Sequence, residues 1–292
     1  MNIIIGKALI AGGGTAKRLE FEYTGTYNER LEDGVVELLT SGVLTFKKET
    51  PIDAFLVGGG SGGCSGWYKT SSFYGGGGGG AGGFTKTLLN IIPRANLEYE
   101  IVIGTGGSAG RSRNDSGQVV TSPTNGGDTV AFGATAGGGK VSTVITSGSS
   151  LPPANWHYLI CGGSGGSGGG QSVGRGITSP FNVAGAGGSD GSDGGAANPQ
   201  PNATNYPIGS GQGTTTREFG EATGKLYAGG GGAGNILGTP TSGGAGGAGN
   251  GGSNMTATPN TGGGGGGANE GSVSTGGDGG SGIVCIRLHK DA

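Results

Sequence analysis

Two serines lie in the pattern G-x-S-x-G, which presents a nucleophile at a sharp turn in many hydrolases. Ser61 is at the centre of residues 59–63, and Ser164 is at the centre of residues 162–166. The pattern works only between a strand and a helix, with a histidine and an acid brought in by the fold. No helical period follows either serine, and chance matches are expected in a chain with 78 glycines. We therefore predict no catalytic residue and no enzymatic activity.

Histidine and cysteine are too few and too widely spaced to predict a metal site. The chain has two histidines and three cysteines, namely His157, His289, Cys64, Cys161 and Cys285. Structural zinc sites place pairs of ligands a few residues apart, and disulfide frameworks use even sets of cysteines. We expect buried free thiols, with one disulfide as the alternative. No metal ligand is assigned.

Nucleic acids, cofactors and membranes also match the sequence poorly. The formal net charge is -2, whereas nucleic-acid binding needs a basic face. Arg111 and Arg113 form a local basic pair, which we interpret as solvated. Residues 104–107 follow an apolar segment, as a dinucleotide-binding loop would, but the rest of that fingerprint is missing. No apolar run reaches bilayer-spanning length, and the N terminus lacks the basic region of a signal peptide. We predict no nucleic acid, no cofactor and no membrane insertion.

Aromatic side chains are the stronger candidates for a binding function. They occur between glycine-rich tracts, in segments rich in polar and turn-forming residues. A flat apolar ring with a polar edge suits a sugar ring or a protein surface. Alternatively, these rings cover the side of a bundle that has few other large side chains. The candidate binding residues are Trp67, Tyr68, Phe73, Tyr74, Tyr206, Arg217 and Phe219.

Glycine-rich tracts flank these candidates and must position them. Residues 162–170 and 243–252 repeat every three residues, with small or polar residues confined to one position in three. Three residues per turn is the period of the polyproline II conformation, which has no internal hydrogen bonds. Its N–H and C=O groups point outward, and each costs roughly 1–3 kcal/mol if buried unpaired. Neighbouring helices of the same kind can pair them where nothing larger than hydrogen separates the backbones.

Two glycines in every three residues suit a helix with neighbours on two or more sides, so we infer a bundle of packed polyglycine II helices. The alternative is a set of flexible linkers, because 78 glycines and 11 prolines among 292 residues reach the share typical of low-complexity disorder. Three observations favour order: the triplet period, a charged fraction of only 12%, and the apolar strand-like segments directly before many tracts.

Strand-like segments frame the tracts. Residues 18–23 alternate polar and apolar side chains, as a half-buried strand does, and residues 97–103 and 283–288 are further strand candidates. The predicted fold is mostly irregular and β, with essentially no α-helix: a bundle of packed polyglycine II helices on a small β-sheet base. We predict a strand-rich attachment region at residues 1–50 and a polyglycine II domain with presented loops at residues 51–292.

The order of these elements resembles the glycine-rich domain found at the ends of bacteriophage tail fibres and related tail proteins. The resemblance covers roughly residues 35–288, and adhesins of the polyglycine-sandwich type are similar in architecture. The segments that carry it are residues 54–60, 75–84, 99–107, 126–133 and 276–284. Residues 1–34 match no family that we can name.

The resemblance implies a virion protein of the phage tail that acts at the host cell surface, as a fibre or tip adhesin without catalysis. Its loops would bind a bacterial surface receptor, either protein or glycan. Its N-terminal region would dock to other phage tail proteins. A homotrimer is a further implication, although coiled-coil heptads are absent. The alternative is a structural or spacer domain of a virion or extracellular assembly that binds no receptor.

Overall fold

The structure is a computed structural model, and it describes most of the 292-residue chain. The described residues are 4–9, 18–69, 73–113, 118–141, 159–160, 162–176, 185–196, 209–213, 216–235, 241–269 and 274–290.

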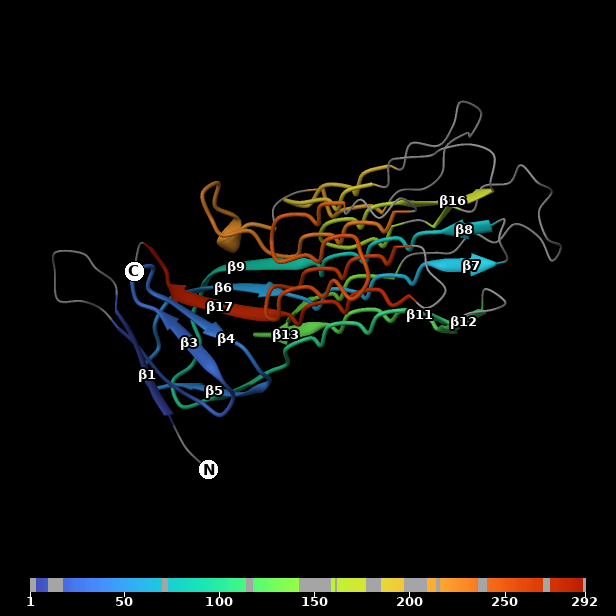
Figure 1. Cartoon of the computed structure of the whole chain (residues 1–292). Coiled ribbons are helices and arrows are strands. Elements are labelled where there is room, and N and C mark those ends of the chain that lie inside the picture. Colours follow the sequence, from blue (N-terminus) through green and yellow to red (C-terminus); the bar gives the residue numbers. More distant parts are fainter. Residues whose placement is uncertain are drawn as a thin grey trace.

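Two antiparallel sheets form a base that contains both ends of the described chain (Figure 1). The first sheet has the order β1 (Ile4–Leu9), β2 (Arg18–Tyr23), β5 (Gly42–Phe46) and β10 (Glu98–Ile101). The second has the order β3 (Tyr27–Arg30), β4 (Val35–Leu38), β17 (Ile283–Leu288), β6 (Ile52–Val57) and β9 (Thr85–Ile91). A short hairpin of β13 (Thr129–Ala131) and β14 (Ala134–Ala136) lies beside them.

The main hydrophobic core combines buried side chains from both base sheets. Phe21 and Phe46 come from the first sheet, and Leu38, Leu56 and Val284 come from the second. The apolar positions of the predicted strands supply this core, and the last strand of the chain returns to the base between β4 and β6. The predicted β-sheet base is therefore confirmed.

The second sheet is covered on its other side as well, by residues 216–228. Phe219 and Tyr227 from this segment form a second core with Phe55, Val57 and Cys285. The segment contains the only helical turn in the described chain, the 3-10 turn η2 (Glu218–Gly220). Because β6 is packed on both sides, all of its residues are buried.

Glycine-rich tracts extend from the base side by side and form the glycine bundle (Figure 1). The bundle comprises residues 58–66, 76–84, 102–110, 122–128, 137–141, 162–171, 185–196, 209–213, 228–235, 241–252, 262–269 and 274–282. We name residues 58–66 the central tract and residues 76–84 the return tract. The central tract leaves β6, and the return tract leads into β9.

Hydrogen bonds from the central tract show the three-residue period directly. Successive N–H groups donate to three different neighbouring tracts in turn, at N···O distances of 2.9–3.1 Å, and the cycle then repeats with each acceptor three residues earlier. The donors and acceptors are Gly59 to Gly127, Gly60 to Gly280, Ser61 to Ala81, Gly62 to Thr124, Gly63 to Gly277 and Cys64 to Gly78. These three neighbours therefore run antiparallel to the central tract.

Further tracts donate to the carbonyl groups of the central tract. Residues 102–110 and 262–269 do so at every third residue and run parallel to it, and residues 137–141 add one bond. The central tract thus has backbone neighbours on all sides. The predicted bundle of polyglycine II helices is confirmed, and the flexible-linker alternative is wrong for these residues.

Close approach of the backbones explains the glycines. A Cβ added at Gly60 would lie 2.0 Å from the Gly263 carbonyl oxygen, and one at Gly63 would lie 2.2 Å from that of Gly266. At every third position the Cβ direction does not meet a neighbouring backbone, so a side chain fits there. Ser61 uses its position to accept a hydrogen bond from Ala81 N–H and to donate one to the Lys140 carbonyl.

The tract at residues 162–170 reverses, which its regular repeat does not predict. Gly163 and Gly166 donate to the carbonyls of Gly79 and Gly82, so this leg runs parallel to the return tract. After a bend at residues 165–167 the chain runs back along the same tract.

The tract at residues 243–252 also turns, at residues 245–247. Gly246 and Gly247 have φ angles of 100° and 85°, a region that side chains disfavour. Glycine adopts turn conformations at little cost in energy. A triplet repeat therefore predicts the local conformation, but not how many residues the helix continues before it turns.

Short paired strands lie at the distal end of the bundle, opposite the base, and include the hairpins β7–β8 and β11–β12 (Figure 1). Their strands are β7 (Trp67–Lys69), β8 (Phe73–Gly75), β11 (Arg111–Arg113), β12 (Gln118–Thr121), β15 (Leu159–Ile160) and β16 (Ser172–Gly176). Four of them form one sheet, in the order β15, β16, β8, β7. The mostly β and irregular fold is confirmed, without α-helix in the described residues.

The boundary at residue 50 remains a prediction. Both base sheets draw strands from either side of it, since β5 pairs with β10 and β4 pairs with β17. Within the described part of the chain, no helix has the length and apolar character needed to span a bilayer.

Candidate functional site

The strongest candidate site is the distal hairpin that contains four of the predicted aromatic residues. The central tract ends at Gly66 and β7 begins at Trp67, while β8 leads into the return tract after Gly75. The hairpin is therefore attached at both ends to tracts that are hydrogen-bonded to each other, for example through Cys64 N–H and the Gly78 carbonyl.

Strand register places several of these residues opposite one another. Tyr68 pairs with Tyr74 across β7 and β8, and Arg175 pairs with Tyr74 across β8 and β16. Tyr68, Tyr74 and Arg175 thus occupy one row of the distal sheet. Trp67 pairs with Gly75, and Phe73 pairs with Lys69. Sequence reasoning missed Arg175, because its position depends on a pairing between residues about a hundred positions apart.

A second hairpin emerges at the same end. Gly107 and Gly110 donate to the carbonyls of Gly60 and Gly63, so residues 102–110 run alongside the central tract in the same direction. β11 therefore begins at the distal end, like β7 (Figure 1). Arg111 and Arg113, interpreted from sequence as a solvated pair, belong to this hairpin.

The remaining candidate residues do not join this group in the described structure. Tyr206 lies outside the described residues. Arg217 and Phe219 lie beside the base, in the segment that covers the second sheet (Figure 1). Arg217 is half-buried, and its Nε lies 3.1 Å from Asp190 Oδ2.

Phe219 has the covering role that was one of the two alternatives for these aromatic rings, and not the exposed binding role. It is only 6% exposed, its ring centroid lies 6.2 Å from that of Phe55, and the Arg287 guanidinium carbon lies 4.0 Å from its centroid. The outer side of the second sheet is apolar, and Phe219 packs against it. This ring is not available on the surface for a receptor.

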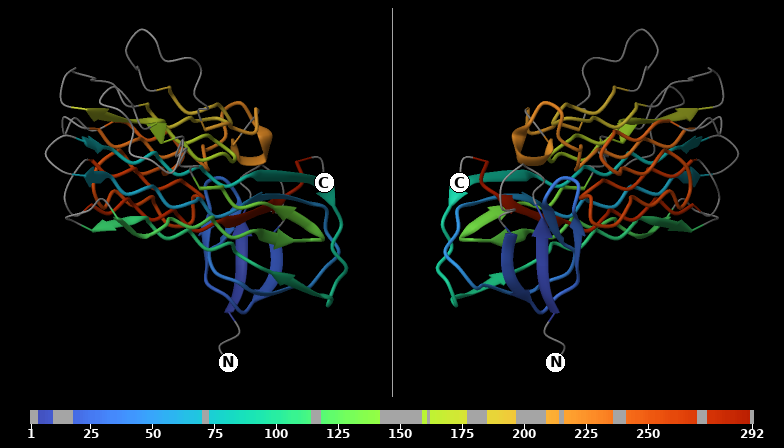
Figure 2. Two further views of the ribbon diagram at one scale, coloured as in Figure 1. Left: turned by 90° about the vertical axis from the view of Figure 1, so that its right-hand side faces the viewer. Right: turned by 90° about the vertical axis from the view of Figure 1, so that its left-hand side faces the viewer.

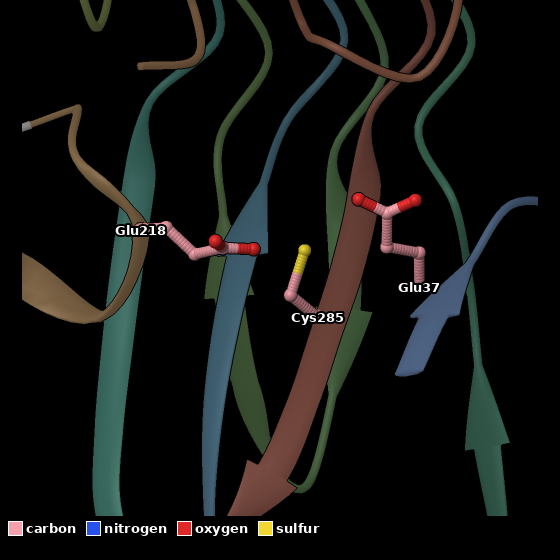
Figure 3. Close-up of side chains that lie close together, drawn as sticks. All are labelled: Glu37, Glu218 and Cys285. Atoms are coloured by element: carbon pink, nitrogen blue, oxygen red, sulfur yellow. The ribbon is translucent and has the colours of Figure 1, made fainter. Parts of the chain in front are cut away.

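A buried polar cluster beneath the same segment was not predicted from sequence. Cys285 on β17 lies between Glu37 of β4 and Glu218 of η2 (Figure 3). The ligand atoms of these three residues lie within 4.8 Å of one another, and all three residues are buried. A carboxylate pair with a sulfur is a donor set that a metal could use.

Cations of the protein already face these carboxylates. Arg30 Nη2 donates to Glu218 Oε1, and Arg30 Nε lies 3.0 Å from Glu37 Oε1 in an ion pair without hydrogen-bond geometry. Lys225 Nζ lies 3.4 Å from Glu37 Oε1. Two positive charges thus match two negative ones, which is the arrangement that makes a buried carboxylate pair tolerable.

The thiol in this cluster is a weak ligand and a weak nucleophile. Burial, followed by the Glu218 charge, raises the pKa of Cys285 well above its usual value, and the thiolate is the reactive form. Burial also raises the pKa of Tyr227, whose hydroxyl donates to Glu218 Oε1 at 3.4 Å. The cluster acts as a polar clamp that holds residues 216–228 on the second sheet.

The two serines of the hydrolase-like pattern have structural contacts. Ser61 is buried inside the bundle, as described above. Ser164 is exposed, and its Oγ accepts a hydrogen bond from Ser210 N–H. His289 lies in the base with its Nδ1 2.6 Å from Asp53 Oδ1, and His157 is outside the described residues.

The expected burial of the cysteines is confirmed where they are described. Cys285 is buried and free, Cys64 is buried, and Cys161 lies outside the described residues. A buried free thiol is therefore confirmed for Cys285.

Comparison with known proteins identifies the family. A family model described as "Glycine-rich domain" matches residues 39–289. No curated protein sequence matches the chain. The matched range contains the whole glycine bundle and the strands β5, β6, β9, β10 and β17 of the base. The chain therefore belongs to the glycine-rich domain family.

Proposed function

We propose that this protein is a phage tail-associated structural protein, a fibre or tip adhesin that binds a bacterial surface receptor through its distal hairpins. The observation that carries the proposal is the attachment of the aromatic β7–β8 hairpin, at both ends, to the two hydrogen-bonded tracts at the centre of the bundle. A hairpin held in this way loses little conformational entropy on binding, so more of its contact energy becomes affinity.

The molecule has two chemically different ends, which suits an attachment protein. The N-terminal strands and the C-terminal strand lie together at the base, away from the distal hairpins (Figure 2). The base exposes large apolar side chains, including Leu89, Ile92 and Leu97. Exposed apolar groups of this kind suit protein contacts. In the proposal, the base docks to other tail proteins, as one copy or as part of a homotrimer, and the distal end faces the host.

The direct test is binding to cells. Fluorescently labelled protein is incubated with a panel of unrelated bacterial strains, and cell-bound fluorescence is measured against protein concentration. The proposal predicts saturable binding to some strains and none to others. It also predicts that Trp67→Ser reduces binding, whereas Leu89→Ser, a matched apolar-to-polar change on the base, does not. A folded protein that binds no strain would instead favour a spacer domain.

A further inference from the structure

Charges are distributed unevenly between the two ends of the molecule. The six distal strands contain four charged residues, and all four are cations: Lys69, Arg111, Arg113 and Arg175. In the base, β2 and β10 alone carry four glutamates, namely Glu20, Glu22, Glu98 and Glu100. A chain with a formal net charge of -2 thus presents a basic set of strands at one end.

The topology brings these cations together from distant parts of the sequence. Lys69 lies in β7, Arg175 lies in β16 of the same distal sheet, and Arg111 and Arg113 lie in the adjacent β11–β12 hairpin. The Asp278 carboxylate, on a neighbouring tract, already accepts a hydrogen bond from Ala109 N–H. Asp115 and Glu270 lie outside the described residues.

Aromatic residues share these strands with the cations. Tyr68, Tyr74 and Arg175 form one row of paired positions and so share one face of the distal sheet, whereas Phe73 and Lys69 form the next row, on the opposite face. Aromatic rings stack on the apolar faces of sugars, and arginine binds carboxylate and phosphate groups through two parallel hydrogen bonds. The row of Tyr68, Tyr74 and Arg175 combines both residue types on one face of the sheet, which suits a ligand that has sugar rings and anionic substituents.

We propose that the distal sheet and the β11–β12 hairpin bind an anionic glycan, a polysaccharide whose sugars carry carboxylate or phosphate groups. The inference rests on the proposed function and narrows its receptor from protein or glycan to this class. Because Arg175 lies in β16 and Arg111 and Arg113 lie in β11 of a separate hairpin, the site would span several sugar units and bind polymers better than single sugars.

The test uses the purified full chain and polymers of similar length. The probes are polygalacturonate, dextran phosphate, neutral dextran and polyglutamate, and binding is measured by isothermal titration calorimetry at low and physiological salt. The inference predicts binding of at least one anionic glycan, weaker binding of polyglutamate and none of dextran. The two anionic glycans distinguish carboxylate from phosphate as the recognised group. Equal binding of polyglutamate and the glycans, or binding of neutral dextran alone, would overturn the inference.

Two charge-matched variants locate the site. Arg113→Ser/Arg175→Ser removes two distal cations, and Lys86→Ser/Arg94→Ser removes two exposed cations of the base that form no ion pair within the described residues. The distal variant is expected to weaken binding of the anionic glycan about tenfold, and the base variant less than about twofold, because long-range effects of charge are screened beyond ~8 Å at physiological salt. Equal losses in the two variants would show that net charge alone drives binding.

A third variant tests the aromatic component. Tyr68→Ser leaves every cation in place, so it is expected to weaken binding of the glycan severalfold and leave that of polyglutamate unchanged. Failure of this inference is distinguishable from failure of the proposed function. If the protein binds bacterial cells and the distal arginine variant binds them equally well, the anionic glycan is wrong and the adhesin stands.

Discussion

In the base, the space between the two sheets is filled by side chains such as Phe21, Phe46 and Leu56. In the glycine bundle, the space around the central tract is filled by the backbones of its neighbours. Both regions exclude water, but the base gains stability from apolar burial and the bundle from paired N–H and C=O groups. Added atoms should therefore destabilise the bundle most, and removed atoms should destabilise the base most.

The largest effect is expected from adding one carbon atom to the bundle. In Gly60→Ala the new Cβ would lie 2.0 Å from the Gly263 carbonyl oxygen, and relief requires two backbones to separate. We expect a loss of more than about 4 kcal/mol in the free energy of unfolding, or no folded bundle. Urea denaturation followed by circular dichroism measures it.

A control in the same tract sharpens this prediction. Cys64 occupies a position that already carries a buried side chain, so Cys64→Ala adds no clash with a neighbouring backbone and should cost less than Gly60→Ala. Similar losses in Gly60→Ala and Cys64→Ala would contradict the account of the bundle.

Removing atoms should have its main effect in the base. Phe46 is buried and contacts the rings of Tyr99 and Phe132, with centroids 6.1 and 6.3 Å away. Phe46→Ala should lower the free energy of unfolding by about 3–5 kcal/mol, through lost burial and a cavity. If the change costs less than about 1 kcal/mol, the base core contributes less than we infer.

The polar clamp between the second sheet of the base and residues 216–228 should give a similar or smaller loss. Arg30→Met keeps most of the side-chain volume but leaves Glu37 and Glu218 buried, with Lys225 as their one remaining cationic partner among the described residues. Breaking a buried pair in this way is expected to cost about 3 kcal/mol. Adding Glu218→Gln to Arg30→Met should recover part of that loss, and a further loss in the double variant would argue against charge pairing.

The smallest effect concerns acid stability. The Arg287 hydrogen bond, assisted by Lys290, lowers the pKa of Glu221 to about 2. A carboxylate with a pKa below its unfolded value of about 4.3 stabilises the fold above that value. This stability is lost as pH falls through about 4 toward 2. The Tm of Glu221→Gln should therefore fall less steeply than that of the wild type over this pH range. Parallel curves would contradict the assignment.

The contrast between the base and the bundle also explains which parts of the fold could be predicted from the sequence. A triplet repeat is a local signal, so it predicted the conformation of the tracts, and alternating apolar residues predicted strands of the base. The reversal at residues 165–167 could not be predicted from the sequence, because glycine forms a bend without a particular residue type beside it.

The candidate site was only partly predictable for the same reason. Trp67, Tyr68, Phe73 and Tyr74 stand out as aromatics next to a glycine tract, so local composition was enough to select them. Arg175 joins them only through the pairing of β16 with β8. The sequence could not decide between the binding and the covering role of Phe219, because its burial depends on Phe55 and Arg287, which are distant in sequence.

Amide hydrogen exchange tests the central claim most directly, resolved by NMR or by mass spectrometry on peptides from the folded protein. The account predicts that the amides of residues 59–64, which all donate to neighbouring backbones, exchange as slowly as those of β6 and β17 in the base. Rapid exchange in residues 59–64 beside a protected base would contradict a backbone-packed bundle, and the rigid presentation of the distal hairpins would be contradicted with it.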